Sequence, residues 1–475
     1  MFSCRPLFFR EVHLTCSGMI RPYSDTLNFV LAWHVSFVAD YKIVESNFAA
    51  SGRRWVILCL AAAVSATMVY RAGKLSLAWY WESSGQPGKQ IRAAELVPGN
   101  AEAWARLGEA TQYSLNETNP SLAITYYLRA VRRNPWSASH WMELANAYEA
   151  TGDVLSAQEA YKNAKRDYPI SADVAWKYGN FLLRHSQTAQ GLSEIHQALL
   201  NDSSLTALAI RGVWNFNPDV NLILDSVLPA TEEADLAALD FFLGIHETQD
   251  ALEVWKRIVA VSRQQAIDIR RAFPLLDELI AQDRSDDARR VWYEALEASR
   301  WPVAAPVDDS IVWNGGFETA IANGGLDWRF QQLPGAYVST DSSTYHSGSQ
   351  SLRVGFTGGV NMDFAHVQQI EPAQPDTTYD FQAYVRTESI STDSGLHFEL
   401  FDPQHERDVY VLTPNIVGTT PWTALHAKVT TSPNTHFLEI RLHRFPSRLF
   451  DNKISGAIWI DDVTLVKEAA RSNHP

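Results

Sequence analysis

The stretch between Pro135 and Pro169, whose positions are 34 residues apart, constrains the fold of this chain more than any other part of its sequence. Two amphipathic helices can be drawn through it, separated by a turn at 151–153. Apolar residues recur on one face of each helix: Trp141, Leu144, Ala145 and Tyr148 before the turn, and Ala157, Tyr161 and Ala164 after it. A single helical pair cannot bury such faces alone, so the pattern predicts further pairs stacked beside it.

This pattern resembles the tetratricopeptide repeat, which reads W-x2-L-G-x2-Y, then A-x3-F, then a closing proline. Ala145 stands at the glycine position of that pattern and Tyr161 at the phenylalanine position. The resemblance implies an α-solenoid of helical hairpins that binds a protein partner along its concave face.

Weaker copies of the repeat flank the complete one. The preceding copy keeps Trp104, Leu107, Gly108, Ala123, Tyr127, Ala130 and Pro135. The following copy keeps Tyr178, Gly179, Gly191, Ile195 and Ala198. We therefore predict tetratricopeptide repeats over 73–204 and two or three divergent helical pairs over 205–301. The small residues should let paired helices approach closely, and the aromatic residues should fill the space between repeats.

The same resemblance implies a partner-binding groove lined by residues of the first helices: Glu109, Asn146, Glu149, Asn180 and Arg184. Asparagine side chains carry both donors and acceptors and can therefore clamp a peptide backbone. The alternative that these side chains are ordinary solvated surface stays open.

An uncharged segment from Trp55 to Tyr70 lies between arginines. Its aromatic ends suit the membrane interfaces, and the flanking arginines can extend to them. We predict a transmembrane or signal-anchor helix over 53–72, after a poorly structured leader over 1–52. A signal-peptide core and a buried core helix are the alternatives. An anchor would make this a single-pass protein of a bacterial inner membrane, with most of the chain on the periplasmic side.

The composition is that of a folded, acidic protein. Hydrophobic residues make up 46% and charged residues 20% of the chain, which argues against disorder. The net charge of −14 argues against nucleic acid as a partner, because the negatively charged phosphates attract a basic protein surface. The cysteines, Cys4, Cys16 and Cys59, all precede residue 60, so the bulk of the chain has neither a disulfide nor a thiolate metal site.

After a proline-containing linker at 302–309, the apolar period changes from 3.6 to about 2. Alternating runs predict strands at 351–356, 379–386, 396–401, 423–429, 436–442 and 457–465. About eight or nine strands over 310–467 predict an antiparallel β-sandwich of the jelly-roll type. The expected fold class is therefore multidomain α + β.

Five short motifs follow one another along this region: Asn314-Gly-Gly-Phe-Glu318, Trp328, His346-Ser-Gly-Ser-Gln-Ser-Leu352, Tyr379-Asp-Phe381 and Trp459-Ile-Asp-Asp-Val463. Their order resembles the galactose-binding-like jelly rolls, which include the carbohydrate-binding modules of xylanases and glucanases. The resemblance implies a glycan ligand and a structural Ca²⁺ that ties the first strand to the last. The matching positions are Glu318 and Asp461, with Asp462 beside them. Equally open is that these carboxylates only hydrogen-bond loop backbone.

Glycan-binding modules stack aromatic side chains on sugar rings and contact hydroxyl groups with polar side chains. By this resemblance the candidates are Trp328, Tyr337, Tyr345, Tyr410 and Trp422, with Asp363 and Arg444 as polar partners. For each of them, core or edge packing is the alternative.

The sequence has no phosphate-binding glycine loop, no nucleophile elbow, no H-E-x-x-H helix and no C-x-x-C pair. We therefore predict a non-catalytic adaptor, anchored in a membrane, with calcium as its single candidate cofactor. The solenoid would bind a protein and the sandwich a polysaccharide, in cell-surface polysaccharide assembly or export. Two alternatives stay open: a scaffold in which both domains bind proteins, and a targeting subunit for a separate carbohydrate-active enzyme.

Overall fold

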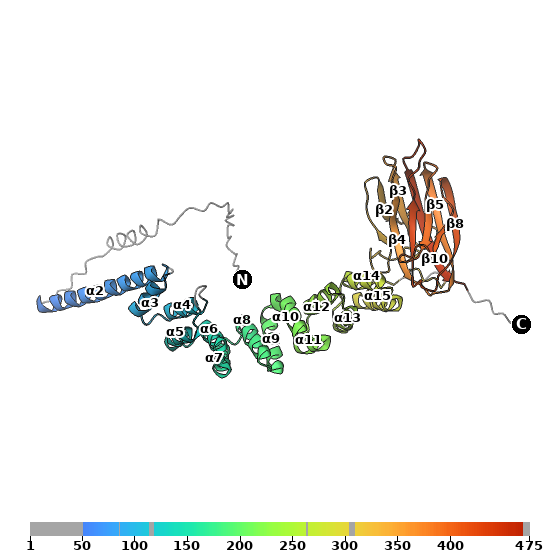
Figure 1. Cartoon of the computed structure of the whole chain (residues 1–475). Coiled ribbons are helices and arrows are strands. Elements are labelled where there is room, and N and C mark those ends of the chain that lie inside the picture. Colours follow the sequence, from blue (N-terminus) through green and yellow to red (C-terminus); the bar gives the residue numbers. More distant parts are fainter. Residues whose placement is uncertain (1–50, 85, 114–117, 263–264, 304–308, 469–475) are drawn as a thin grey trace, which may run out of the picture. The chain divides into compact units, whose positions relative to one another are not determined.

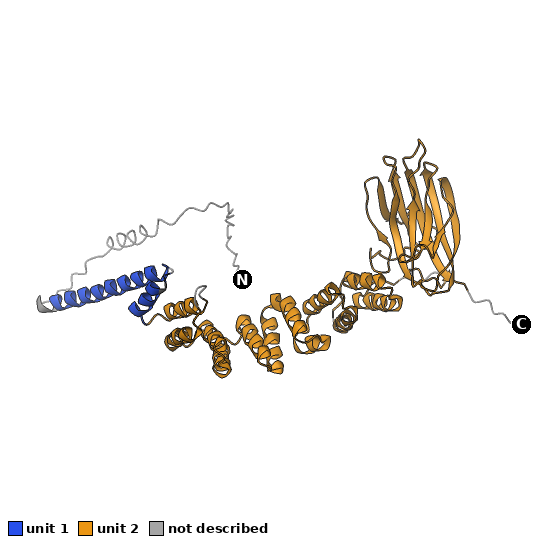
Figure 2. Ribbon diagram, viewed as in Figure 1, with its two compact units in different colours: residues 1–98 blue, residues 99–475 orange. Residues whose placement is uncertain are grey.

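The computed structural model describes residues 51–84, 86–113, 118–262, 265–303 and 309–468. They belong to two compact units, 1–98 and 99–475, which Figure 2 shows in blue and orange. The predicted leader up to residue 50, and 304–308 of the predicted linker, lie outside the described residues.

The first unit contains α2 (Ser51–Glu82) and α3 (Pro87–Leu96) (Figure 1). The part of α2 at Arg54–Glu82 is 29 residues long. An 18-residue segment within it has a mean hydropathy of 1.7, and none of that segment is buried. The helix runs past the predicted span of 53–72, because the apolar and aromatic residues of 75–81 continue it. Its length and composition suit a membrane span, although a signal sequence near the N-terminus would meet the same criteria.

The second unit begins with three helical hairpins: α4 (Ala101–Gln112) with α5 (Pro120–Arg133), α6 (Ala138–Ala150) with α7 (Val154–Asp167), and α8 (Ala172–Arg184) with α9 (Thr188–Asn201). Ser137, Asp153 and Ser171 are the N-cap residues directly before α6, α7 and α8, and each side chain accepts an amide hydrogen of the first turn. These hairpins confirm the predicted tetratricopeptide-like helical repeats.

More helices continue the solenoid: η1 (Ser203–Leu205), α10 (Thr206–Phe216), α11 (Val220–Ser226), α12 (Glu232–Gly244), α13 (Thr248–Ser262), η2 (Ile269–Ala272), α14 (Phe273–Ala281) and α15 (Ser285–Ser299). Trp255 of α13 and Trp292 of α15 are buried at equivalent places in their helices. The helical pattern therefore persists where the repeat motif fades.

Small residues lie where two helices nearly touch. A methyl group added at Gly108 would lie 2.7 Å from the Tyr127 ring, and one added at Gly179 would lie 2.9 Å from the Gly191 carbonyl oxygen. Ala145 is fully buried in the same way. The prediction of close helix packing is confirmed, because a side chain at these glycines would force the helices apart.

The remainder of the second unit is a sandwich of two five-stranded antiparallel sheets (Figure 1). Sheet A has the order β1-β4-β9-β6-β7, and sheet B has the order β2-β3-β10-β5-β8. The strands are β1 (Arg329–Phe330), β2 (Ala336–Asp341), β3 (Ser351–Thr357), β4 (Phe364–Pro372), β5 (Thr378–Ile390), β6 (His397–Phe401), β7 (Tyr410–Leu412), β8 (Gly418–Thr430), β9 (Phe437–Arg444) and β10 (Ser455–Lys467). All six predicted runs are strands, and β1, β2, β4 and β7 are additional.

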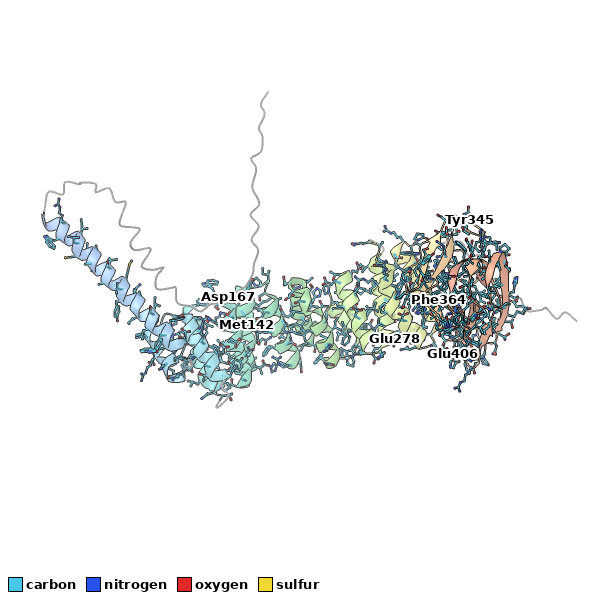
Figure 3. The ribbon with its side chains drawn as sticks, turned by 90° about the horizontal axis from the view of Figure 1, so that it is seen from above. Met142, Asp167, Glu278, Tyr345, Phe364 and Glu406 are labelled. Carbon is cyan, nitrogen blue, oxygen red and sulfur yellow. The ribbon has the colours of Figure 1, made fainter. Side chains whose placement is uncertain are left out.

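Alternation along the strands builds the sandwich core. Phe381, Ala383 and Val385 of β5 are buried between the sheets, while the residues between them face outward. Figure 3 shows Phe364 of β4 within the sandwich and Tyr345 at its edge, in agreement with their exposed fractions of 0% and 44%. The predicted antiparallel sandwich is confirmed.

Within the second unit, the end of the solenoid packs on the sandwich. Trp292 of α15 meets Trp313 edge-on, with 5.9 Å between ring centroids, and Arg329 of β1 pairs with Asp277 of α14 at 2.8 Å. The apolar core of the solenoid also includes two residues of sheet A: Ile370 and Phe437. The contact therefore covers one end of sheet A.

Candidate ligand-binding faces of the β-sandwich

The outer face of sheet B carries a hollow of ≈ 790 Å³ beside β5, β8 and β10. Its lining side chains come from these strands and from the loop after β2: His346, Ser347, Asp380, Gln382, Tyr384, His426, Lys428, Asp462, Thr464 and Val466. Even-numbered residues of β5 and β8 meet there because side chains alternate across a strand and the register pairs Gln382 with His426. We call this feature the sheet B hollow.

Three aromatic side chains meet at the sheet B hollow. The His346 ring is stacked on Tyr384, with 3.6 Å between ring centroids and 14° between ring planes. Trp422 meets His346 closer to edge-on, at 5.7 Å and 64°. This arrangement joins flat apolar surfaces to polar ring atoms, which suits a ligand with both C–H faces and hydroxyl groups.

Charged and polar side chains surround this aromatic surface. The Lys428 ammonium lies 3.3 Å from the Asp380 carboxylate and 3.1 Å from that of Glu468, and all three side chains are solvent-exposed. Gln382 and His426 add further hydrogen-bonding groups to the lining. The hollow therefore combines capacity for hydrogen bonding with an aromatic surface.

Two predicted calcium ligands, Asp461 and Asp462, hold the loop beside the hollow. Asp461 Oδ2 accepts the amide hydrogens of His346 and Ser347 at 2.7 and 3.1 Å. Asp462 accepts the Ser347 hydroxyl at 2.8 Å and lies 2.6 Å from His346 Nδ1. Burial raises the pKa of Asp461 to about 6, although its amide hydrogen bonds act in the opposite direction.

Glu318, the third predicted calcium ligand, binds the same loop. Its Oε1 accepts the amide hydrogens of Ser349 and Gln350 at 2.9 and 3.3 Å. Calcium requires several oxygens directed at one point, whereas N–H and O–H donors occupy the oxygens of these carboxylates. Among the described residues, these three do not form a group whose ligand atoms lie within 4.8 Å of one another. The geometry fits the alternative of backbone-binding carboxylates, and calcium binding stays a prediction.

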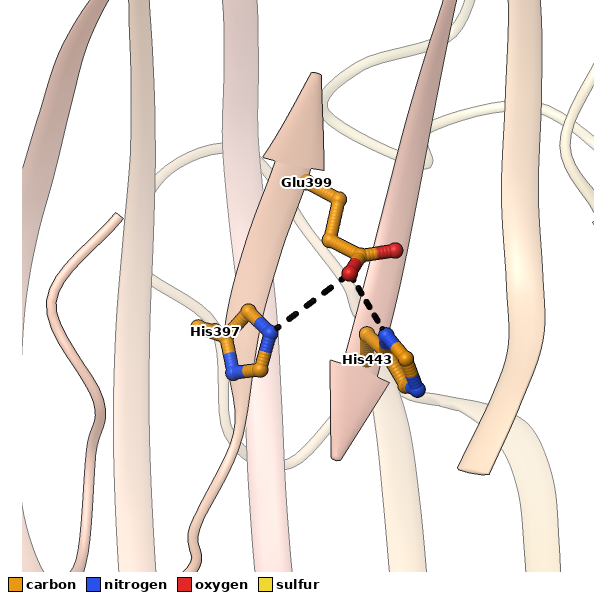
Figure 4. Close-up of side chains that lie close together, drawn as sticks. All are labelled: His397, Glu399 and His443. Atoms are coloured by element: carbon orange, nitrogen blue, oxygen red, sulfur yellow. Dashed lines mark hydrogen bonds and ion pairs between the residues drawn. The ribbon is translucent and has the colours of Figure 1, made fainter. Parts of the chain in front are cut away.

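The outer face of sheet A carries a second group, formed by His397, Glu399 and His443 (Figure 4). The register of β6 and β9 places His397 opposite His443, and Glu399 follows on the same face of β6. His443 Nδ1 lies 2.6 Å from Glu399 Oε1, and His397 Nε2 lies 3.8 Å from that same oxygen. The three residues are 7%, 1% and 8% exposed. We call them the His–Glu–His cluster.

Further side chains complete the surroundings of this cluster. The Tyr410 hydroxyl donates to Glu399 Oε1 at 2.6 Å, and Arg441 Nε donates to Glu399 Oε2 at 2.8 Å. His443 Nε2 lies 2.7 Å from Asp363 Oδ1. Burial by itself raises the pKa of Glu399, but the hydrogen bonds from Tyr410, His443 and Arg441 outweigh it and hold that pKa below its usual value.

The predicted glycan candidates are distributed over both faces. Tyr410 and Asp363 meet at the His–Glu–His cluster, whereas Trp422 lies at the sheet B hollow and Tyr345 directly precedes His346. Tyr337 lies on β2, with the Arg353 guanidinium 5.4 Å from its ring centroid. A glycan contact by any of these side chains stays a prediction.

Two of the predicted glycan contacts are wrong, because the side chains are completely buried. Trp328 is 0% exposed, and its Nε1 donates to the Asn314 carbonyl oxygen at 3.2 Å. Arg444 is also 0% exposed, and its guanidinium donates to the carbonyl oxygens of Ser394 and Asn452 at 3.0 and 2.9 Å. Trp328 is therefore part of the core, and Arg444 holds loops together.

On the solenoid, Glu149 and Arg184 link the first helices of consecutive hairpins, α6 and α8. Arg184 Nη2 lies 2.8 Å from Glu149 Oε2, and His185 Nε2 lies 3.0 Å from Glu149 Oε1. Burial opposes ionisation of Glu149, but its bonds to Arg184 and His185 outweigh this effect and lower its pKa. Two predicted groove residues are thus brought together.

The other predicted groove residues are less uniform. Asn146 accepts the Tyr161 hydroxyl at 2.6 Å, and Asn180 Nδ2 donates to the Trp176 carbonyl oxygen at 2.8 Å. Both asparagines are half-buried, whereas Glu109 is exposed. Each amide keeps further donor and acceptor capacity, and partner binding here stays a prediction.

The residues at the centre of both faces were absent from the sequence-based candidates: His346, Tyr384, His397, Glu399 and His443. Strand alternation is a signal that could have placed Tyr384 and Glu399 on outer faces. The meeting of His397 with His443 depends on which strands are neighbours and in what register, which no local pattern in the sequence encodes.

A comparison with known protein families agrees with the architecture of the C-terminal sandwich. Residues 309–447 match a family model described as a carbohydrate binding domain. The C-terminal sandwich is a carbohydrate-binding-module-like domain. The match ends before β10, which is the central strand of sheet B. In this chain the module-like domain is joined to tetratricopeptide-like helical repeats.

Three further likenesses are limited in extent. General transcription factor 3C polypeptide 3 of Homo sapiens is 29% identical over 111 residues, which cover 22% of this chain and 12% of that protein's length. YrrB, described as a TPR protein with an unusual peptide-binding site, is 14% identical, covering 44% of this chain and 92% of its own, with a TM-score of 0.23. The CBM22-1 xylan-binding domain from Paenibacillus barcinonensis Xyn10C is 16% identical, covering 35% of this chain and 100% of its own, with a TM-score of 0.26.

Proposed function

We propose that this chain is a non-catalytic adaptor whose module-like domain binds a glycan in the sheet B hollow. The observation that carries the proposal is the stacked surface of His346 and Tyr384 inside that hollow. A ring face can cover the C–H face of a sugar, while Gln382, His426 and Lys428 exchange hydrogen bonds with its hydroxyl groups. The match of this domain to a carbohydrate-binding family supports the assignment of the ligand class.

Glycan-array binding by the purified full chain tests this proposal. Tyr384→Ala and Trp422→Ala should each weaken binding, because each removes one aromatic surface at the hollow. Tyr410→Ala is the matched control, since it removes a half-exposed tyrosine from the outer face of sheet A. If only the control variant lost binding, the glycan site would belong to sheet A. If the folded wild-type chain bound no glycan, the scaffold alternative would replace this proposal.

For the solenoid we propose a protein partner along the first helices, near Asn146, Asn180 and the Glu149–Arg184 pair. Exposed and half-buried polar side chains at equivalent places in successive hairpins suit an extended peptide. Crosslinked pull-down of the full chain, compared with an Asn146→Ala/Asn180→Ala variant, tests it. A partner recovered equally by both chains would contradict these contacts.

We further propose that α2 anchors the chain in a bacterial inner membrane, with both folded parts outside the cytoplasm. The unburied apolar stretch at Arg54–Glu82 supports a membrane span. A role in the assembly or export of a cell-surface polysaccharide follows from an anchored protein that binds both a glycan and a partner. Membrane fractionation with a protease-accessibility assay tests the topology, and a soluble, protease-protected chain would refute it.

A further inference from the structure

The His–Glu–His cluster gathers three metal-binding side chains around one point. His397 Nε2, Glu399 Oε1 and His443 Nδ1 all lie within 4.8 Å of one another (Figure 4). They come from two adjacent strands of sheet A, so the sheet itself holds their spacing. The sheet B hollow, where the glycan is proposed to bind, uses none of these residues.

His397 has a ring nitrogen that lacks a hydrogen-bond partner. Its Nε2 is buried and makes no hydrogen bond with any residue in the described part of the chain. The nearest carboxylate oxygen, Glu399 Oε1, is 3.8 Å away, which is too far for a hydrogen bond. A buried nitrogen without a partner is unfavourable, and a neutral imidazole nitrogen is a common metal ligand.

The His443 ring lies between two carboxylates, those of Glu399 and Asp363. Its Nδ1 faces Glu399 Oε1 at 2.6 Å, and its Nε2 faces Asp363 Oδ1 at 2.7 Å. Each ring nitrogen therefore lies within hydrogen-bond distance of a carboxylate oxygen. A divalent cation can take the place of the Nδ1 proton: the N–H bond breaks, an N–metal bond forms, and one proton goes to solvent.

The residues around the cluster are suited to orient the three ligands. In metal sites, the second ring nitrogen of a ligating histidine typically donates to a carboxylate, as His443 Nε2 would to Asp363. Arg441 holds the other oxygen of Glu399, at 2.8 Å from its Nε. The Phe445 ring lies over both imidazoles, with ring centroids 5.1 Å from His397 and 4.2 Å from His443. These contacts restrict the rotamers of the ligands and limit the access of water.

We propose that His397 Nε2, His443 Nδ1 and Glu399 Oε1 bind one divalent transition-metal ion, with Zn²⁺ as the best match. Two imidazoles and one carboxylate are typical zinc ligands, whereas Ca²⁺ and Mg²⁺ prefer oxygen ligands throughout. Ligand atoms around a tetrahedral Zn²⁺ are roughly 3.3 Å apart. The 2.6 Å contact must therefore lengthen and the 3.8 Å separation must shorten, each by less than an ångström. The Tyr410 hydroxyl, which also donates to Glu399 Oε1, can keep its bond because that oxygen has a second lone pair for the metal. Three protein ligands leave one coordination position open for water or another ligand.

Equilibrium dialysis of the EDTA-treated full chain against ZnCl₂, with metal content read by mass spectrometry, tests the site. We expect the wild-type chain to bind one equivalent more than a His397→Ala/His443→Ala variant. His246→Ala is the matched control, because it removes an exposed histidine of the solenoid, and it should bind like wild type. Replacing Zn²⁺ by Co²⁺ should give four-coordinate visible absorption in the wild type that the double variant lacks.

Asp363→Asn adds a readout that does not disturb the core, because the Asp363 side chain is 63% exposed. Loss of this outer partner should weaken Zn²⁺ binding by about 10- to 100-fold. Equal zinc binding by the wild type and a folded double variant would overturn the proposal. If the double variant does not fold, unchanged zinc affinity in Asp363→Asn would overturn it.

Discussion

The two outer faces of the sandwich use similar residue types in opposite physical settings. The sheet B hollow and the His–Glu–His cluster each combine histidine, carboxylate and tyrosine side chains. In the hollow, Asp380 and Lys428 stay in solvent, where an ion pair contributes little to stability. In the cluster, Glu399 is 1% exposed and every charge needs a partner. Burial, more than residue type, therefore distinguishes a face suited to a neutral, hydroxyl-rich ligand from a face suited to a cation.

The largest expected difference between the faces is in stability. Glu399→Ala in the metal-free chain should reduce the free energy of unfolding of the sandwich by about 3–5 kcal/mol, because it removes a buried carboxylate that Tyr410, His443 and Arg441 all contact. Denaturant unfolding followed by tryptophan fluorescence measures this change. Asp380→Ala, in the hollow, is the control and should leave the unfolding midpoint in place. Similar losses in both variants would break the comparison.

For glycan binding, we expect the larger effect from a substitution in the sheet B hollow. Tyr384→Ala should weaken glycan affinity about tenfold, close to 1.4 kcal/mol, because a stacked ring surface is lost. Its unfolding midpoint should change little, since Tyr384 is half-buried and faces outward. Titration of the identified glycan, together with thermal unfolding, measures both effects. A variant that loses stability but keeps its affinity would show that Tyr384 is a packing residue.

Two carboxyl groups, Asp461 beside the sheet B hollow and Glu399 in the His–Glu–His cluster, should contribute pH dependences of opposite sign to the free energy of unfolding. Folded Asp461 keeps its proton up to a pKa of about 6, whereas in the unfolded chain it loses the proton near 3.9. Between these values the folded chain binds more protons, so its free energy of unfolding falls as pH rises. The pKa of Glu399 is lowered, so its contribution is present above its unfolded pKa and is lost as pH falls through the folded pKa.

Paired unfolding measurements at pH 5 and pH 7 check this prediction. Asp461→Asn should lose less stability than the wild type between these two pH values, even if it is less stable at both. Glu399→Gln should cost more stability at pH 7 than at a pH below the folded pKa of Glu399. An equal pH dependence in the wild type and Asp461→Asn would contradict the assignment of the titration to Asp461.

The smallest effect is expected for Lys428→Ala. The ammonium group is exposed and shared between Asp380 and Glu468, so solvent and salt screen both pairs. We expect no measurable change in the unfolding midpoint at physiological salt. A clear drop in the unfolding midpoint would show that the ion pairs of Lys428 with Asp380 and Glu468 stabilise the sandwich despite their exposure.

Much of the fold could be predicted from local patterns. The spacing of Trp141, Leu144, Ala157 and Tyr161 indicates a helical hairpin, because the positions that share a face of a helix depend on the backbone period alone. Period-2 alternation found six strands for the same reason. The short strands β1 and β7 were missed, since two or three residues are too few to show a period.

The candidate sites were predicted less completely, because a site depends on contacts between distant segments. Trp422, Tyr410 and Asp363 do lie on outer faces beside polar clusters. Trp328 and Arg444 have side-chain types that also occur in ligand sites, yet both are buried. A sequence does not show whether a loop aromatic residue points inward or outward until the opposing sheet is in place.

The sequence by itself determined the architecture of this protein: a long apolar helix, stacked helical hairpins and an antiparallel sandwich. These follow from periods of a few residues and from the repeat length, which are local properties of the chain. Only the tertiary structure decided that His397 meets His443 and that His346 lies on Tyr384. The physical reason is that strand register and loop position are set by packing between segments tens of residues apart.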